Sequence, residues 1–259
     1  MQREQKIHLL DQAMIECNWG TPKSKIIDRP EWAQILTADA VHSSANCVFR
    51  SRLASSEVQA KVTQTFEQYE AMKVPYRWLV TPLTEPADLS KVLISKGMTL
   101  LYEATAMMSS VEDQIQPMPE GVSVVKVDLN NVEVYVETFV RSWELPSHQV
   151  ADFKKDVIYG LETSADRFLP FVAYYKNEPV GTSALLNIPS GGYLAAGTVD
   201  PKYRGRGIYR AMVSHRAEVA KQLNHDCLLM HAKKLTSAPI CKKLGFEAVF
   251  DYQVFSKEK

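Results

Sequence analysis

The pattern of hydrophobic and polar residues predicts an ordered series of helices and strands in the second half of the chain. Over 130–143, apolar residues recur every three or four positions, which is typical of a helix that buries one face. These residues are Val132, Val136, Phe139, Val140 and Trp143. The same reasoning predicts further helices over 150–162, 207–223 and 236–244, and strands over 168–175, 180–188, 193–199, 227–231 and 248–255.

The first three of these strands follow one another with short polar turns between them. Lys176-Asn-Glu separates the first two strands, and Pro189-Ser-Gly-Gly separates the second from the third. Short turns of this composition between β-rich runs are typical of antiparallel hairpins. We therefore expect three consecutive antiparallel strands, followed by a loop rich in glycine and arginine and then a helix.

The end of the first half of the chain resembles the end of the second half in sequence. When Gly97 is aligned with Gly245, Met98 falls opposite Phe246. Each glycine would close a helix in the left-handed conformation that glycine adopts at little cost, and a strand would follow. A strand and a long helix, 56–73 in the first half, precede each joint at the same spacing. Such joints also arise by chance, but three elements in one order favour an internal duplication.

A polar segment at 109–122 separates the two halves. It contains two prolines, one glycine and several polar residues between apolar stretches, which is the composition of a linker. We therefore predict one domain over 1–110 and another over 115–259, as two copies of one unit.

Composition narrows the functional classes. Of the 259 residues, 46% are hydrophobic and 23% are charged, which is ordinary for a globular protein with a core in each half. Lysine plus arginine and aspartate plus glutamate number 30 each, so binding of nucleic acid or of an anionic membrane is not expected as the main task. No apolar run predicts a transmembrane helix, and the charged N-terminus predicts no secretion signal.

The four cysteines are far apart in the sequence and have no histidine at ligand spacing. This pattern predicts no metal site, and free thiols are expected in a reducing compartment. We therefore expect a cytoplasmic protein.

One loop carries the candidate chemistry. A strand that ends at Val199 leads through Arg204-Gly-Arg-Gly into a helix, whose first backbone N–H groups have no partner within the helix. Those groups and the positive end of the helix dipole favour an anion. Gly205 and Gly207 allow the backbone to form a concave nest, and Arg204 and Arg206 add charge suited to phosphate. The loop therefore predicts a phosphate or pyrophosphate site.

The other interpretation of the loop is a basic surface turn without a ligand. It is not a Walker loop, because no Gly-Lys-Ser/Thr follows, and it comes after three antiparallel strands rather than the first strand of a dinucleotide fingerprint. The first half has Leu53-Ala-Ser-Ser-Glu at the matching place, without a glycine or a basic pair. We therefore predict the anion site in the second half alone.

These residues resemble a known family. Val199-Asp-Pro-Lys-Tyr-Arg-Gly-Arg-Gly-Ile is similar to motif A of the GNAT superfamily of N-acetyltransferases, with its pattern Arg/Gln-x-x-Gly-x-Gly/Ala, and Leu244-Gly-Phe-Glu is similar to the end of its motif B. The resemblance covers about 115–259, and the 1–110 half looks like a degenerate copy in a tandem arrangement. It implies an α+β (α/β/α) fold with two domains, each a mixed, mostly antiparallel sheet flanked by helices.

The resemblance also implies that the chain is an enzyme that binds acetyl-CoA and transfers its acyl group to an amine by direct attack. The backbone at Thr198 and Val199 would pair with the pantetheine arm. The amides of the following loop would hold the pyrophosphate; its residues are Arg204, Gly205, Arg206, Gly207, Ile208 and Tyr209. The acceptor would be a small-molecule or peptide amine, and a second copy of the chain, in a homodimer, is a candidate partner.

Two positions depart from the family pattern. Tyr209 stands where motif A ends in Gly or Ala, which keeps the glycine nest but changes its rim. Cys241 stands four residues before the Gly-Phe pair, where the family usually has a tyrosine that protonates the departing thiolate. A thiol with a pKa of about 8.5 could donate that proton. The other interpretation is a small buried packing residue.

The remaining candidates leave the acceptor open. His231 ends a predicted strand and is either structural or a general base. Trp143 and Glu144 end a helix in the region that lines the acceptor site in the family, and are either packing and solvent residues or acceptor contacts. Because the usual tyrosine is missing, the alternative function is a non-catalytic acyl-CoA-binding or sensor module.

Overall fold

The computed structural model describes residues 1–259 except 19–23, 39, 41 and 258–259. The chain divides into two units. Unit 1 comprises Met1–Met107, His231–Lys243 and Glu247–Lys259, and unit 2 comprises Met108–Met230 and Leu244–Phe246. The domain bounds 1–110 and 115–259 stay a prediction from the sequence repeat. The two units divide the chain differently, because most of its C-terminal part groups with the first half.

Unit 1 is a mixed sheet with the strand order β1-β2-β3-β4-β11-β5. Its strands are β1 (Ser24–Asp28), β2 (Trp32–Thr37), β3 (Cys47–Ser51), β4 (Tyr76–Val80), β5 (Thr99–Ser110, whose last residues belong to unit 2) and β11 (Glu247–Lys257). Its helices are α1 (Arg3–Glu16), η1 (Ser43–Ala45), α2 (Val58–Met72), α3 (Leu89–Ser95) and α8 (Ser237–Lys243). Pairing is antiparallel from β1 to β3, parallel between β3 and β4, and antiparallel between β4 and β11.

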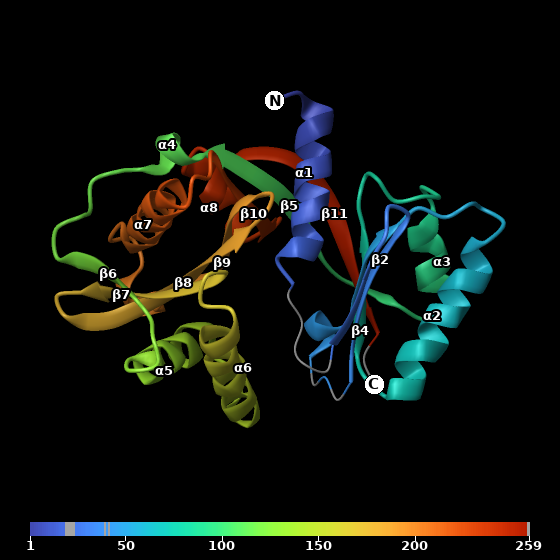
Figure 1. The fold of residues 1–259 in the computed structure, drawn as a ribbon, viewed down its shortest axis with the longest axis horizontal. Helices are drawn as coiled ribbons and strands as arrows, with labels where there is room; N and C mark the ends of the chain where they lie inside the picture. The colour runs from blue at the N-terminus through green and yellow to red at the C-terminus, as the bar shows by residue number, and fades with distance from the viewer. Residues whose placement is uncertain (19–23, 39, 41, 258–259) are drawn as a thin grey trace. The chain divides into compact units, whose positions relative to one another are not determined.

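The core of unit 1 lies between this sheet and α2. Apolar residues of α2 recur every three or four positions, so one face of the helix is buried; they are Val58, Val62, Phe66 and Tyr69. They pack with Trp32 of β2 and Trp78 of β4, whose rings meet edge to face at 5.5 Å between centroids. Figure 1 shows α2 and α3 on the same side of these strands.

Unit 2 has the strand order β10-β9-β8-β7-β6. Its strands are β6 (Val122–Lys126), β7 (Phe168–Tyr175), β8 (Glu178–Ile188), β9 (Gly191–Val199) and the first part of β10 (Cys227–Lys233). Its helices are α4 (Val111–Gln114), α5 (Val132–Trp143), η2 (Ser147–Gln149), α6 (Val150–Thr163), η3 (Pro201–Tyr203) and α7 (Ile208–Gln222). In Figure 1, α7 covers one face of β6–β9, while α5 and α6 cover the other.

The strand pairings of unit 2 confirm the predicted hairpins. Strands β7, β8 and β9 pair antiparallel in sequence order, and β9 pairs parallel with β10. The turn between β7 and β8 has two left-handed residues, Lys176 and Asn177, which is the conformation of a type I′ turn. The fold is therefore α+β, with mostly antiparallel strands flanked by helices, as predicted.

The repeated joints are confirmed as well. Helices α3 and α8 are followed by Gly97 and Gly245, with φ of 89° and 94°. Each half also contains the same series of strand, long helix, strand, short helix and strand: β3-α2-β4-α3-β5 and β9-α7-β10-α8-β11. No helix among the described residues is long and apolar enough to cross a membrane.

The segment predicted as a linker, 109–122, is ordered on unit 2 and is not a free connection. Ser110 ends β5, and its hydroxyl accepts a hydrogen bond from the amide of Asp113, which caps α4. Further on, the hydroxyl of Ser214 in α7 accepts from the amide of Gln116 and donates to its carbonyl, both at 2.8 Å. Prolines stop regular structure here, but the backbone of the residue before them still has a partner on α7.

Candidate functional site

The predicted anion loop joins β9 to α7 in unit 2. Gly205 and Gly207 have φ of 79° and 77°, and Gly207 is the N-cap of α7. Backbone that turns through left-handed glycines at the start of a helix can present successive N–H groups to one anion. Residues 204–207 are exposed. The geometry of the loop therefore matches the nest that its sequence predicts.

A buried carboxylate fixes the start of this loop. Asp200 is 5% exposed, and its carboxylate accepts from the amide of Lys202 at 3.0 Å and from Nε of Arg141 at 2.9 Å. Burial alone would raise the pKa of Asp200, but these two hydrogen bonds and the positive charges of Arg141 and Lys202 together outweigh burial, so the pKa is lowered. The ionised carboxylate therefore ties the loop to the end of α5. Arg141 and Asp200 are distant in the chain, so this pair could not be predicted from the sequence.

The two arginines of the loop have different surroundings. Arg204 donates from Nε to the carbonyl oxygen of Val199 at 3.1 Å, so its side chain braces the turn after β9. The guanidinium of Arg206 lies 5.2 Å from the ring centroid of Tyr175, and Nζ of Lys176 lies 5.6 Å from the same centroid. Arg206 and Lys176 therefore place two positive charges around one ring, next to the glycine nest.

Strand β9 carries a β-bulge just before the loop. Thr182 and Ala184 of β8 pair with Thr198 and Ala195 of β9, so one residue of β8 lies opposite two residues of β9. One of those two, Ala196, has φ of 51°, a conformation that is strained for any residue except glycine. Residues 195–198 are half-buried. A bulge turns backbone groups out of the regular ladder, so it can aim them at a ligand.

A buried arginine holds the two strands together at the bulge. Arg216 of α7 is 1% exposed, and its Nη1 donates to the carbonyl oxygens of Ala184 at 3.1 Å and Ala195 at 3.2 Å. Its Nε donates to the carbonyl of Met212 at 3.0 Å. Arg216 was not among the site residues predicted from the sequence. The one available signal was an arginine on the apolar face of the predicted helix 207–223.

Tyr209, which departs from the family pattern, packs against the bulge. A Cβ atom at Gly197 would lie 3.1 Å from Cε2 of Tyr209, so glycine at that position leaves room for the ring. Tyr209 also packs on the apolar cluster that contains Ile208 and Val199. The bulky ring therefore occupies space provided by β9 and leaves the conformation of the glycine nest unchanged.

The end of α5 lies beside the bulged part of β9. Thr198 donates from its hydroxyl to the carbonyl of Ser142 at 3.4 Å. The next residue, Trp143, is 49% exposed and stacks on Phe139, which stacks on Phe153 of α6; the centroid distances are 5.5 and 4.1 Å. We call Phe139, Trp143 and Phe153 the aromatic shelf. It is a half-exposed apolar surface next to Thr198.

Two candidates from the sequence belong to unit 1. Cys241 lies on α8 and is 1% exposed. Its role as a proton donor stays a prediction, while its burial is typical of a packing cysteine. His231 bonds to the backbone of Leu10 and meets the ring of Tyr252 edge to face. Burial lowers the pKa of His231 to about 3, which is too low for a general base at neutral pH.

Within the described part of the chain, no three His, Cys, Asp or Glu side chains are grouped as a metal site requires. The glycine loop at 204–207, the bulge with Arg216 and the aromatic shelf all lie in unit 2. This part of the chain can therefore bind an anion at one end of β9 and an apolar group beside the same strand.

Comparison with known proteins finds a family match for this part of the chain. A family model described as "Acetyltransferase (GNAT) family" matches residues 132–246. The fold is similar to that of a GCN5-related N-acetyltransferase from Kribbella flavida, with 13% identity and a TM-score of 0.72 over 98% of this chain and 95% of that one. It is also similar to a tandem GNAT protein from the clavulanic acid biosynthesis pathway, with 12% identity and a TM-score of 0.64 over 96% and 87% of the two chains.

A functionally unknown conserved protein from Staphylococcus epidermidis has 12% identity and a TM-score of 0.70, over 92% of this chain and 95% of that one. At these identities the likeness to solved structures shows the fold alone. No curated protein matches the chain.

Proposed function

We propose that this chain transfers an acetyl group from acetyl-CoA to an amine, because a model of the acetyltransferase (GNAT) family matches residues 132–246. The observation that carries the proposal is the loop between β9 and α7, where two left-handed glycines begin a helix beside Arg206. A pyrophosphate is the anion that such a loop suits, because it offers several oxygens to successive backbone N–H groups.

The residues of the loop fit the pyrophosphate of acetyl-CoA. Gly205 has no atom within 4 Å of the place where a Cβ would lie, so its surface is open to a ligand. Arg206 and Lys176 supply charge, and the acid closest to them in sequence, Glu178, accepts a hydrogen bond from the hydroxyl of Tyr203. Arg204 supports the site through the carbonyl of Val199 and need not touch the ligand.

Beside the loop, the half-buried residues 195–198 would receive the pantetheine arm. Strand β9 pairs with β10 at Gly192 and Tyr193, which precede the bulge. A backbone N–H that the bulge turns toward the thioester carbonyl would polarise it and stabilise the negative charge that develops on oxygen. Arg216 would keep the bulge in place, because it bonds to both strands.

The chemistry requires few protein groups. Acetyl-CoA, when bound, supplies an activated acetyl thioester. The amine nitrogen attacks the carbonyl carbon, the C–N bond forms as the C–S bond breaks, and the CoA thiolate leaves. One proton leaves the amine and one is taken up by the thiolate, so the products are an amide and free CoA. The protein contributes mainly position and polarisation.

The aromatic shelf beside β9 favours an acceptor amine with a flat apolar group. Trp143 of the aromatic shelf follows Ser142, whose carbonyl bonds to Thr198 of β9. Stacking on an exposed indole is favourable for a planar apolar group. We therefore propose arylalkylamines as the first acceptors to test, ahead of short aliphatic amines.

The experiment measures thiol release from acetyl-CoA by the full chain, with tryptamine, phenethylamine, ethanolamine, an aminoglycoside or a lysine-containing peptide as acceptor. Release that requires an amine supports the proposal, and faster release with the arylalkylamines supports the acceptor class. Calorimetric binding of acetyl-CoA without release for any amine would instead support the acyl-CoA-binding module. Absence of acetyl-CoA binding in the micromolar range would contradict both functions.

A further inference from the structure

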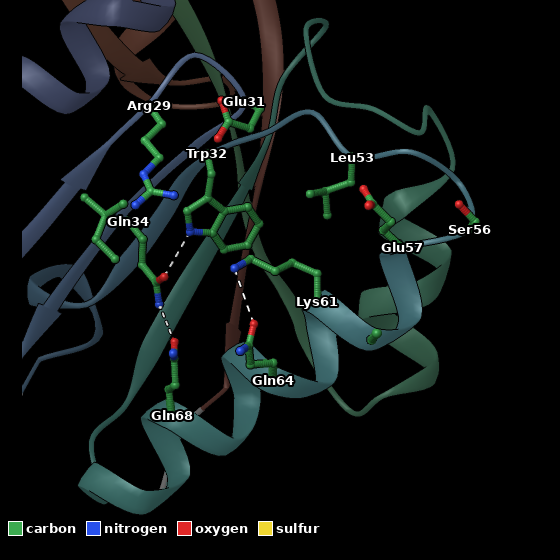
Figure 2. A pocket seen from close by; sticks show the side chains of 12 residues that line it. Arg29, Glu31, Trp32, Gln34, Leu53, Ser56, Glu57, Lys61, Gln64 and Gln68 are labelled. Carbon is green, nitrogen blue, oxygen red and sulfur yellow. Dashed lines mark hydrogen bonds between the residues drawn. The ribbon is translucent and has the colours of Figure 1, made fainter.

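Unit 1 contains a cavity of about 820 Å³ on the side of α2 that faces the β1–β2 hairpin. Figure 2 shows its walls: Arg29, Trp32 and Gln34 extend from the hairpin, and Lys61 and Gln64 extend toward them from α2. This volume is in the range of cavities that hold small molecules or a few residues of a peptide. The cavity is distinct from the anion loop, which belongs to unit 2.

The inner wall of the cavity is rich in side-chain amides. Gln34 is 2% exposed; its Oε1 accepts from the indole N–H of Trp32 at 3.0 Å, and its Nε2 donates to Gln68 at 3.5 Å. Gln64 accepts from Nζ of Lys61 at 3.4 Å. Each amide carries both a donor and an acceptor, as a peptide bond does. Both ends of the Gln34 amide are already bonded, so the exposed amides of Gln64 and Gln68 are the ones that can exchange hydrogen bonds with a peptide backbone.

In unit 2, another part of the chain covers the corresponding face of the long helix α7. Glu57 is the N-cap of α2 and Gly207 is the N-cap of α7, so Gln64 and Ser214 occupy the same position, seven residues further on. Ser214 is buried and exchanges two hydrogen bonds with the backbone of Gln116. A Cβ at Gly207 would lie 3.2 Å from the ring of Pro119. The chain from 116 to 119 therefore lies along this face of α7.

In unit 1 the corresponding face of α2 borders the cavity instead. Glu57, Lys61, Gln64 and Gln68 are spaced by three or four residues and line it together. The step from Glu57 to Gln68 is about 16 Å at the rise of an α-helix. An extended segment of about five residues covers that distance.

We propose that this groove binds an extended peptide segment, in the place that residues 116–119 take along α7. The direction seen in unit 2 runs from position 214 toward the N-cap of the helix. A peptide in the same direction would pass the amides first, then the positive charges of Lys61 and Arg29, and would end near the carboxylates of Glu57 and Glu31. The segment that fits carries an acidic residue followed by a basic residue. This proposal does not depend on acetyl transfer.

The test uses fluorescence anisotropy with the full chain and two fluorescein-labelled peptides of equal composition, Gln-Ile-Gln-Glu-Pro-Lys-amide and its charge-swapped form Gln-Ile-Gln-Lys-Pro-Glu-amide. The first peptide should bind saturably and about tenfold more tightly than the second, because it pairs each charge with its opposite. Gln64→Leu should weaken binding about threefold or more. Glu67→Gln is the matched control, since Glu67 is exposed on the same helix but does not line the cavity, and it should have no effect.

The Lys61→Glu variant makes the test independent of a simple folding defect. It should lose affinity for the first peptide about tenfold and should then prefer the charge-swapped peptide. A misfolded variant would lose affinity for both peptides and would not gain affinity for the charge-swapped one. The proposal is overturned if neither peptide binds saturably, if Lys61→Glu leaves the preference unchanged, or if free L-glutamate and L-lysine displace the peptide at equal concentration, which would indicate a small-molecule site.

Discussion

Nη1 of Arg216 lies 3.2 Å from the carbonyl oxygen of Ala195, at the point where β9 leaves its regular register with β8. The same nitrogen donates to Ala184 on β8. One buried guanidinium therefore joins α7, which begins at the glycine loop 204–207, to both strands of the bulge. The shape of the bulge and the position of the loop depend on the same side chain.

Arg216→Met should lower the free energy of unfolding by about 2–5 kcal/mol, because it removes the hydrogen bonds of a buried guanidinium to the carbonyl oxygens of Ala184 and Ala195. Arg216→Lys should cost less, since an ammonium group can still donate to one of them. Denaturant unfolding of both variants measures the difference. Arg210→Met, at an exposed position of the same helix, should change stability by less than about 0.5 kcal/mol. Equal stability of the Arg216 and Arg210 variants would refute the bracing role.

Gly207→Ala should destabilise the protein more than Gly205→Ala. Both residues are left-handed, so alanine costs about 1–2 kcal/mol at either place. At Gly207 the added methyl group also meets Pro119 at 3.2 Å, whereas the surroundings of Gly205 are open. Paired denaturation curves measure the order, and acetyl-CoA titration should show weaker binding for both variants. The reverse order of stability would contradict the described geometry.

Arg206→Glu and Arg204→Glu should fail in different ways. The first puts a negative charge beside the nest, so affinity for acetyl-CoA should fall about tenfold or more, since a charge-assisted bond contributes about 1.5–3 kcal/mol. The second removes the bond to Val199 and should mainly lower stability, by about 1 kcal/mol. Calorimetry and thermal unfolding separate the two effects. Lys91→Glu, at an exposed position of α3, is the control for net charge and should affect neither.

Stability should depend on pH through Asp200. Hydrogen bonds lower the pKa of this carboxyl in the folded protein, so its contribution is present above the unfolded pKa of about 4 and is lost as the pH falls through the lower, folded value. Asp200→Asn should therefore be less stable than the parent at neutral pH, and the difference should shrink below about pH 4. Asp152→Asn, at an exposed carboxylate, should show no such convergence in melting temperature.

Cys241→Ala should lower turnover by less than about threefold if the thiol only packs, whereas loss of a general acid typically lowers turnover by about 10²–10⁴-fold. Because Cys241 is buried, Cys241→Tyr should destabilise the fold by about 1–3 kcal/mol through overpacking. Thiol release and melting temperature of the two variants measure this. A Cys241→Tyr variant that is both stable and faster would instead show that the position still serves catalysis.

Local features of the structure were predictable from the sequence. Helices α5 and α7 have clear apolar periodicity, and their observed bounds lie within two residues of the expected ones. The glycine loop was predictable too, because left-handed backbone at a helix start strongly selects glycine. These features depend on residues that are close together in the chain.

Features that depend on distant pairs were not predictable. Nothing near Asp200 in the sequence indicates that Arg141 is its partner. The alternation of residues along a strand tells which face of the strand is buried, but not which strand lies beside it. The repeat suggested that the terminal strand belongs with the second half. The pairing of Gln253 with Val80 and of Lys257 with Tyr76, in unit 1, joins distant parts of the chain and cannot be read from the repeat. The linker was misread for the same reason, since its partner Ser214 is far away in the chain.

The place of β11 beside β4 has a consequence for how the protein is made. The ribosome finishes Tyr76–Val80 early, but the strand that pairs with it, Gln253–Lys257, comes only after all of unit 2 has been synthesised. At about 5–20 residues per second this delay is on the order of ten seconds or more. During that time the edge of β4 that will pair with β11 is open on the growing chain, so other strands can pair with it. The half of the molecule that is translated first is therefore the half whose folding is completed last.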